Sequence, residues 1–157
     1  MRRKLELLKT IAAGFNAGGI TWALGASMLL YFKGMVSEFN DIDLMVMTED
    51  IDKARKILDG LGRQLPEKDN TGFATRYFLE YDIEGVGVDL MAGFAVVAGG
   101  EVHDCALAAD QIVEYADLFG ERIPLQSVEL WRRYYNLMGR ESKVRLIDDF
   151  LENVSVK

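Results

Sequence analysis

Apolar residues recur at helical spacing near the start of the chain, over residues 3–15. The spacing places them on one face of a helix that would cover a core; they are Leu5, Leu8, Ile11, Ala12 and Phe15. A short apolar run over residues 20–24 follows and ends at the small residues Gly25-Ala26-Ser27, before a second apolar stretch to Phe32. We therefore expect a helix, then a strand, a tight turn and a second helix.

The segment Asp-Ile-Asp-Leu-Met-Val-Met, residues 41–47, alternates polar and apolar positions at its start and is wholly apolar at its end. This pattern predicts a strand that becomes fully buried along its length. A helix is expected to follow over residues 49–60, with Thr48 as its N-cap and Gly60 at its end.

Two hairpins are predicted in the middle of the chain. Residues 75–81 and 86–91 have strand composition and are separated by a short turn. Residues 94–98 and 101–105 flank Gly99-Gly100, a connection that can adopt the positive φ angles of tight hairpins.

Helical spacing returns after Pro124 and continues to the end of the chain. We expect a single domain over residues 1–157, with a mixed sheet core over residues 1–105 and a mainly helical part over residues 106–157. The predicted class is α/β (α+β): a mixed, mostly antiparallel sheet flanked by helices, with a helical C-terminal segment.

The composition fits one folded unit: 157 residues, 50% hydrophobic and 27% charged, with a formal net charge of −7. The net acidity argues against broad binding to nucleic acid, which needs Lys and Arg to neutralise phosphates. Cys105 is the single cysteine, which excludes an internal disulfide and fits a reducing cytoplasmic setting. The apolar stretch at residues 20–32 is shorter than the ~20 residues of a membrane span, so no membrane partner is expected.

Three aspartates need an explanation. Asp41 and Asp43 are two residues apart on a predicted strand, so both side chains point to one face, where oxygen ligands favour Mg²⁺ or Mn²⁺. A turn that simply caps the strand explains the same pair. Asp89 interrupts an otherwise apolar strand and would be costly to bury alone. Its partner is either Arg76 on the neighbouring strand or a metal shared with Asp41 and Asp43.

The turn Gly25-Ala26-Ser27 is the third candidate feature. Small residues allow a phosphate to approach the backbone, and the hydroxyl of Ser27 adds a polar contact. Tight packing between a strand and a helix explains the turn equally. The chain has neither the P-loop motif nor the dinucleotide-binding glycine pattern.

Together the small-residue turn, the Asp-x-Asp strand and a third Asp on an adjacent strand resemble the nucleotidyltransferase superfamily with the DNA polymerase beta-like fold. The chain looks most similar to the small antibiotic nucleotidyltransferases of the lincosamide type and to related toxins. The match covers residues 20–91, and residues 123–143 are similar to the helical segment that follows in those families.

The resemblance implies transfer of a nucleoside monophosphate from an NTP such as ATP to a hydroxyl of a small acceptor, with release of pyrophosphate. Mg²⁺ or Mn²⁺ would be the cofactor, and whether the chain forms homo-oligomers is left open. Asp41, Asp43 and Asp89 would bind the metal ions, and Asp89 would also orient or deprotonate the acceptor. The implied nucleotide-binding residues are Gly25, Ala26, Ser27, Arg140 and Lys143; solvated helix positions explain the last two equally.

Departures from the family pattern leave two alternatives open. Ser37 and Phe39 stand where many relatives have Arg-x-Thr, and Val144 replaces an acid. A catalytically degenerate nucleotide-binding or interaction module would tolerate these changes. A toxin-like enzyme that modifies tRNA or a protein would instead use the basic residues concentrated between positions 121 and 145.

Overall fold

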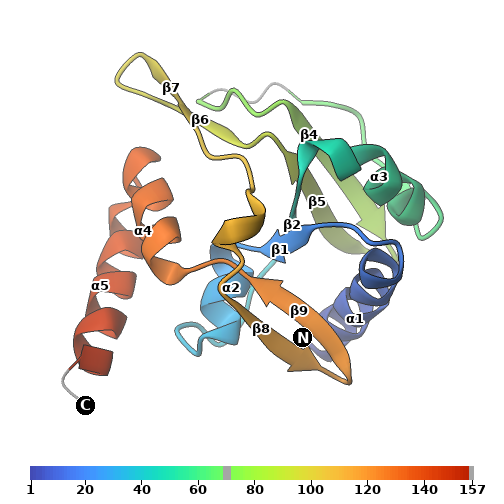
Figure 1. Ribbon diagram of the computed structural model, residues 1–157, viewed down its shortest axis with the longest axis horizontal. Coiled ribbons are helices and arrows are strands. Elements are labelled where there is room, and N and C mark those ends of the chain that lie inside the picture. Colours follow the sequence, from blue (N-terminus) through green and yellow to red (C-terminus); the bar gives the residue numbers. More distant parts are fainter. Residues whose placement is uncertain (69–71, 156–157) are drawn as a thin grey trace.

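A computed structural model of the chain describes residues 1–68 and 72–155. Helices and strands combine in an α+β arrangement around one large sheet, with a helical pair at the C-terminal end (Figure 1). This confirms the predicted fold class. The sheet has seven strands in the order β3-β4-β5-β2-β1-β9-β8.

Pairing in the sheet is mixed but mostly antiparallel. β2 with β5 and β1 with β9 are parallel, whereas β1 with β2, β3 with β4, β4 with β5 and β8 with β9 are antiparallel. The strands of this sheet are β1 Trp22–Leu24, β2 Ile42–Val46, β3 Arg63–Gln64, β4 Tyr77–Ile83, β5 Val86–Ala92, β8 Glu114–Leu118 and β9 Glu121–Leu125.

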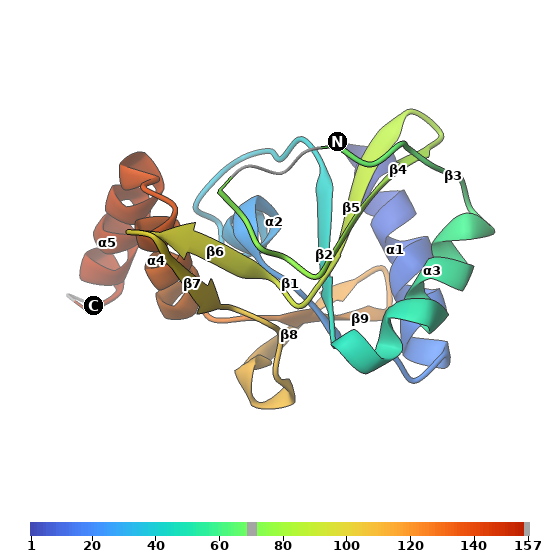
Figure 2. The ribbon, with the colours of Figure 1, turned by 90° about the horizontal axis from the view of Figure 1, so that it is seen from above.

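The helices form two groups on opposite sides of the sheet. α1 and α3 lie side by side, while α2, α4 and α5 lie together at the other side (Figures 1 and 2). The helices are α1 Arg2–Ala17, α2 Ala26–Phe32, α3 Ile51–Asp59, α4 Val128–Leu137 and α5 Glu141–Ser155. None of the helices described is long and apolar enough to cross a membrane.

The core lies between the sheet and the helices. Most of the predicted apolar face of α1 is completely buried, with Leu5 partly buried at its start, and Ile42 and Leu44 of β2 are buried with it. Alternation along β2 then turns Asp43 toward the opposite side. The parallel pairing of β2 with β5 sets Asp43 directly opposite Asp89.

The second predicted hairpin is present as a separate two-stranded sheet, β6 Ala95–Ala98 with β7 Glu101–Asp104. Its turn is Gly99-Gly100, and both glycines have positive φ, as expected. β6 packs against α4, which places this hairpin beside the C-terminal helices (Figure 2).

Two predictions are wrong in detail. Residues 106–127 are not helical apart from a short 3-10 turn, Ala109–Gln111, because β8 and β9 join the main sheet. The sequence pattern of β8 indicated a strand only weakly, because β8 is an edge strand with exposed residues at alternate positions. Thr48 does not cap α3: a 3-10 turn, Thr48–Asp50, comes first, and the Asp50 carboxylate instead accepts a hydrogen bond from the backbone N–H of Thr21.

Candidate active site

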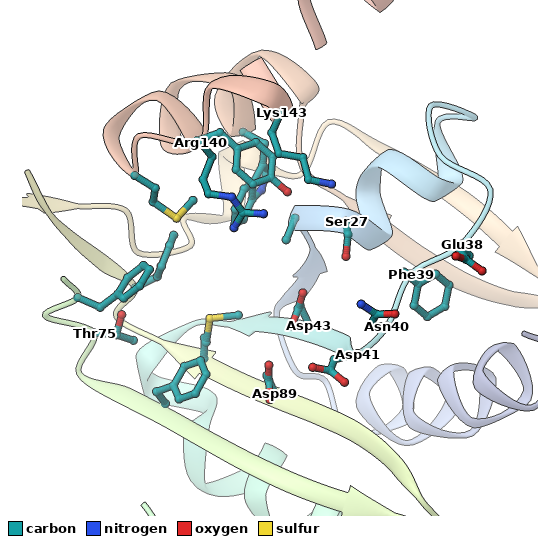
Figure 3. A pocket seen from close by; sticks show the side chains of 18 residues that line it. Ser27, Glu38, Phe39, Asn40, Asp41, Asp43, Thr75, Asp89, Arg140 and Lys143 are labelled. Carbon is teal, nitrogen blue, oxygen red and sulfur yellow. The ribbon is translucent and has the colours of Figure 1, made fainter. Parts of the chain in front are cut away.

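A cavity of about 560 Å³ lies between the sheet and the corner where α4 meets α5. Side chains from distant parts of the sequence line it, and Figure 3 shows them facing the same space. The contributing segments are residues 26–27, 38–43, 73–78, 89–94 and 131–143. Of the sequence-predicted residues, all but Gly25 line the cavity directly, and Gly25 immediately precedes Ala26.

The three aspartates come together because β2 and β5 are parallel neighbours. Asp43 and Asp89 are register partners on the two strands, so their carboxyl groups lie close enough for each to affect the pKa of the other. Asp41 precedes β2 and leans over Gly87 of β5: a Cβ atom on that glycine would lie 2.5 Å from Asp41 Oδ1. Gly87 therefore makes room for the Asp41 carboxylate, a contact that the sequence pattern did not identify.

Burial and neighbouring negative charge raise the pKa values of Asp43 and Asp89. Burial, followed by the negative charge of Asp89 and their hydrogen bond and then by the charge of Asp41, raises the pKa of Asp43 well above its ordinary value. Burial raises the pKa of Asp89 to about 6; the hydrogen bond with Asp43 opposes this rise, and the charges of Asp41 and Glu80 add to it. The raised pKa values mean that loss of both protons from this pair is costly in the folded protein.

Protein cations do not neutralise this cluster. Arg76, the alternative partner for Asp89, lies over the ring of Tyr77 at 5.3 Å instead. Across residues 1–68 and 72–155, none of the ion pairs involves Asp41, Asp43 or Asp89. Lys68 lowers the pKa of Asp89 through its charge, but its nitrogen is 3.7 Å from Glu80. The negative charge thus remains largely uncompensated.

These oxygen donors fit a divalent cation. The repulsion among the three carboxylates is the force that a bound Mg²⁺ or Mn²⁺ would relieve, and both ions prefer oxygen ligands. In the described part of the chain, no three His, Cys, Asp or Glu side chains form a ready-made metal cage. Mg²⁺ in nucleotide sites typically takes one or two carboxylates and completes its shell with water and phosphate oxygens, which suits the Asp43–Asp89 pair.

The turn at the start of α2 has an unusual backbone. Ala26 has a φ of +52°, in the left-handed region that favours glycine. Gly25 is buried beneath Trp131, and a Cβ atom there would lie 2.3 Å from the indole. Ser27 points its hydroxyl toward the carboxylates (Figure 3). Packing therefore explains Gly25, whereas Ser27 is free to contact a ligand.

A buried amide holds Trp131 over this turn. Gln126, completely buried, accepts a hydrogen bond from Trp131 Nε1 at 2.8 Å and donates to Gln111 Oε1 at 3.2 Å. Its backbone N–H also donates to the carbonyl oxygen of Leu24, one residue before Gly25. The same residue thus fixes both the tryptophan and the strand that leads into the turn.

The cationic side of the cavity is the corner between α4 and α5. Arg140 and Lys143 extend into the cavity there, across from the carboxylates (Figure 3). The corner is tight because Gly139 has a φ of +73°, and the Arg140 N–H donates to the Tyr135 carbonyl at 2.8 Å. The two cations predicted from the sequence therefore share one space with the three predicted aspartates.

Tyr135 is a site residue that sequence analysis missed. It lines the cavity, and burial together with the negative charge of Asp43 raises the pKa of its hydroxyl. The Arg140 guanidinium is 5.8 Å from its ring, so the tyrosine lies between the anionic and the cationic side. Its helical spacing marked it only as a core residue; its position four residues before the Gly139-Arg140 corner was the available signal.

The departures from the family pattern have structural roles. Phe39 is buried against Tyr31, with ring centroids 5.2 Å apart, and its carbonyl accepts a hydrogen bond from Lys4 Nζ. Val144 packs against the core. Ser37 is exposed, and the neighbouring Glu38 and Asn40 line the cavity mouth. The segment before β2 is therefore anchored by an aromatic side chain where relatives have a polar one.

No protein-family profile matches the sequence, and curated proteins give no match either. Solved structures, in contrast, do match this chain. A protein from Thermotoga maritima assigned as a candidate nucleotidyltransferase superposes with a TM-score of 0.75 at 19% identity, over 98% of this chain and 95% of that one.

The antibiotic-resistance factor ANT(2'')-Ia is also similar. Its solution structure gives a TM-score of 0.69 at 20% identity, covering 99% of this chain and 89% of that one. Its crystal structure in complex with adenylyl-2''-tobramycin gives 0.66 at 19% identity, covering 98% and 94%. The chain therefore shares the fold of these proteins, which confirms at the level of the fold the resemblance inferred from its motifs.

Proposed function

We propose that the protein is a Mg²⁺- or Mn²⁺-dependent nucleotidyltransferase that transfers a nucleoside monophosphate from an NTP to a hydroxyl of a small acceptor. One observation carries the proposal: three uncompensated aspartates and two cations, Arg140 and Lys143, face each other across a single cavity. The similarity to ANT(2'')-Ia, whose crystal structure contains an adenylylated tobramycin, supports it.

Asp43 and Asp89, with Asp41 beside them, are the residues proposed to hold the metal. A bound divalent cation would offset the charge on the triphosphate and on the α-phosphorus as the reaction proceeds. Binding of a cation would require both carboxylates to be ionised, so it would be accompanied by loss of any proton that they carry.

Ser27, Arg140 and Lys143 are the proposed contacts for the β- and γ-phosphates. The Ser27 hydroxyl can donate to a phosphate oxygen, and the two cations provide charge-assisted hydrogen bonds from the opposite side. Because Arg140 and Lys143 are not engaged in ion pairs among the described residues, they remain free to bind an anion. Pyrophosphate would leave on this side.

Asp89 is the proposed base for the acceptor. Its carboxylate lines the cavity, where an acceptor hydroxyl can approach it and transfer a proton to it. The acceptor oxygen forms a bond to the α-phosphorus, the bond from that phosphorus to the pyrophosphate oxygen breaks, and the hydroxyl proton passes to Asp89. Tyr135 orients the cationic corner through its contact with Arg140.

A small acceptor is favoured over tRNA because four of the basic residues of the C-terminal part are engaged within the protein or point into the cavity. Arg132 is paired with Asp148, and the Arg122 guanidinium lies 4.9 Å from the ring of Tyr115 on the β8–β9 hairpin. Arg140 and Lys143 point into the cavity instead. A polyanion such as tRNA would also meet the carboxylate cluster.

A screen of the four NTPs with Mg²⁺ or Mn²⁺ against a panel of hydroxylated small molecules tests this function, with pyrophosphate release as the readout. We expect release that requires the metal, the NTP and an acceptor together. A rise in melting temperature with NTP and metal, but no pyrophosphate with any acceptor, would instead support a non-catalytic nucleotide-binding module. Release that also occurs with Asp43→Asn would contradict the assigned site.

A further inference from the structure

The part of the cavity next to Asp89 has an apolar wall. Met91 follows Asp89 by two residues on β5, so both side chains point to the same face. Phe78 on β4 is the register partner of Met91 and extends this surface. Phe73 stacks on Phe94 with ring centroids 6.0 Å apart, and both rings line the cavity. A molecule placed against Asp89 would therefore rest on aromatic and thioether groups.

The polar groups of this wall are already engaged. The hydroxyl of Thr75 lies within hydrogen-bonding distance of the backbone of Ala95, 3.3 Å from its N–H and 3.4 Å from its carbonyl. The indole N–H of Trp131 donates to Gln126. Neither group is left free to recognise a polar substituent, so the wall offers shape and apolar surface.

The wall formed by Phe73, Phe78, Met91 and Phe94 carries no charge of its own, although Asp89 lies beside it. Arg140 and Lys143 are on the side proposed for the phosphates, and the three aspartates are proposed to hold metal. Among the described residues that line the cavity, Glu38 is the one remaining acid, and it lies at the mouth beside Asn40. A molecule with several ammonium groups would find a single carboxylate to pair with.

We infer that the acceptor is an uncharged hydroxyl compound with an apolar face, such as an aryl or alkyl glycoside or an alcohol with a hydrophobic ring. Its hydroxyl would lie beside Asp89, and its apolar body would pack against Phe73, Phe78, Met91 and Met138. Phe73, Phe78 and Met138 are only partly buried, so a ligand can cover them and gain from burying apolar surface. This inference rests on the proposed function, because that function defines which ligand lies next to Asp89.

Methyl NMR of the methionines tests the inference without any turnover. The chain has seven methionines, of which Met91 and Met138 line the cavity. Protein labelled at the methionine methyl groups is titrated with 4-nitrophenyl β-glucoside and, separately, with the polyamino sugar tobramycin. Leu substitutions of single methionines assign the signals. We expect the glucoside to shift the Met91 and Met138 signals selectively and tobramycin to leave them unchanged.

A matched pair of variants locates the binding. Phe78→Gln is expected to weaken glucoside binding about tenfold or more, whereas Phe119→Gln, at an exposed hairpin tip, leaves it unchanged. The melting-temperature rise produced by ATP and Mg²⁺ shows that each variant is folded. No selective shift with the glucoside, or an equal or stronger effect of tobramycin, overturns the inference.

The two proposals fail in different ways. Pyrophosphate release with tobramycin but with none of the neutral glycosides leaves the nucleotidyltransferase activity standing and refutes the apolar acceptor. Selective Met91 and Met138 shifts without turnover for any NTP support the apolar subsite and refute the activity for the acceptors tested.

Discussion

The two sides of the cavity are built in opposite ways. The anionic side comes from β2 and β5, rigid neighbouring strands whose register alone sets Asp43 against Asp89. The cationic side comes from a glycine-turned corner between α4 and α5, where Arg140 is exposed. Acidic groups are therefore held partly buried and close together at a cost in stability, whereas the cations lie near solvent.

That difference separates two tasks. Buried like charges are tolerated when a bound cation or a proton reduces their repulsion, so the strand side favours binding of a metal ion. Arg140 and Lys143 carry their charges at the ends of long, flexible side chains. These charges can therefore move with a phosphate group as it binds and leaves. Variants on the strand side should thus affect turnover and stability in opposite directions, and variants on the helical side should affect mainly nucleotide affinity.

The largest expected effect is that of Asp43→Asn. Removing this carboxylate should lower nucleotidyl transfer by about a thousandfold, because the metal loses a central ligand. The same change should raise the melting temperature of the metal-free protein, because it removes a buried like charge. Pyrophosphate release and thermal unfolding measure the two effects, and Asp117→Asn on the exposed β8 strand is the control. A loss of both activity and stability would contradict the account.

Gly25→Ala should be the next largest change. The added methyl group would lie 2.3 Å from the Trp131 indole, so the tryptophan or the turn must shift. We expect a loss of about 1–3 kcal/mol in the free energy of unfolding and weaker nucleotide binding. Chemical denaturation followed by fluorescence measures the first effect. Gly60→Ala, which meets only ordinary contacts at 3.5 Å or more, is the control and should be nearly neutral.

The pH dependence of stability tests the strand side without a variant. The pKa of Asp89 is raised from 3.8 to about 6 in the folded protein. The contribution of Asp89 to the free energy of unfolding is therefore fully present below pH 3.8 and is lost as the pH rises through about 6. Between about pH 5 and about pH 7 we therefore expect the metal-free protein to become less stable. Mg²⁺ should stabilise the protein more at the higher pH. An equal effect of Mg²⁺ at both values would argue against binding at these carboxylates.

The smallest effects are expected on the helical side. Arg140→Gln and Lys143→Gln should each raise the KM for the NTP by about tenfold or less, since each removes one charged contact near solvent. Their melting temperatures should stay close to that of the wild type. Arg145→Gln, two residues further along α5 and exposed, should change neither quantity. A large fall in kcat with an unchanged KM would assign these residues a role in the chemical step instead.

The strand side could be predicted from sequence because its signals are local. A spacing of two residues put Asp41 and Asp43 on one face, and the charge in an apolar strand marked Asp89. The apolar runs likewise gave most of the main sheet. Only the parallel register of β2 and β5, a long-range property, had to come from the structure.

The helical side could not be predicted in the same way. Trp131 and Tyr135 have the spacing of core residues, and nothing local indicates that their helix packs beside the Gly25 turn. The Gln126 amide that fixes Trp131 is also a tertiary feature, since it joins residues from β1, α4 and the 3-10 turn at Gln111. β8 was missed because an exposed edge strand lacks the continuous apolar pattern of a buried one.

Transfer of labelled phosphorus tests the central claim most directly. The protein is incubated with Mg²⁺, an acceptor found in the screen, and an NTP labelled at either the α- or the γ-phosphorus. The account predicts that the α-label becomes covalently attached to the acceptor and that the γ-label appears in pyrophosphate, both effects being lost with Asp43→Asn. Attachment of the γ-label to the acceptor, or its release as inorganic phosphate alone, would contradict the account.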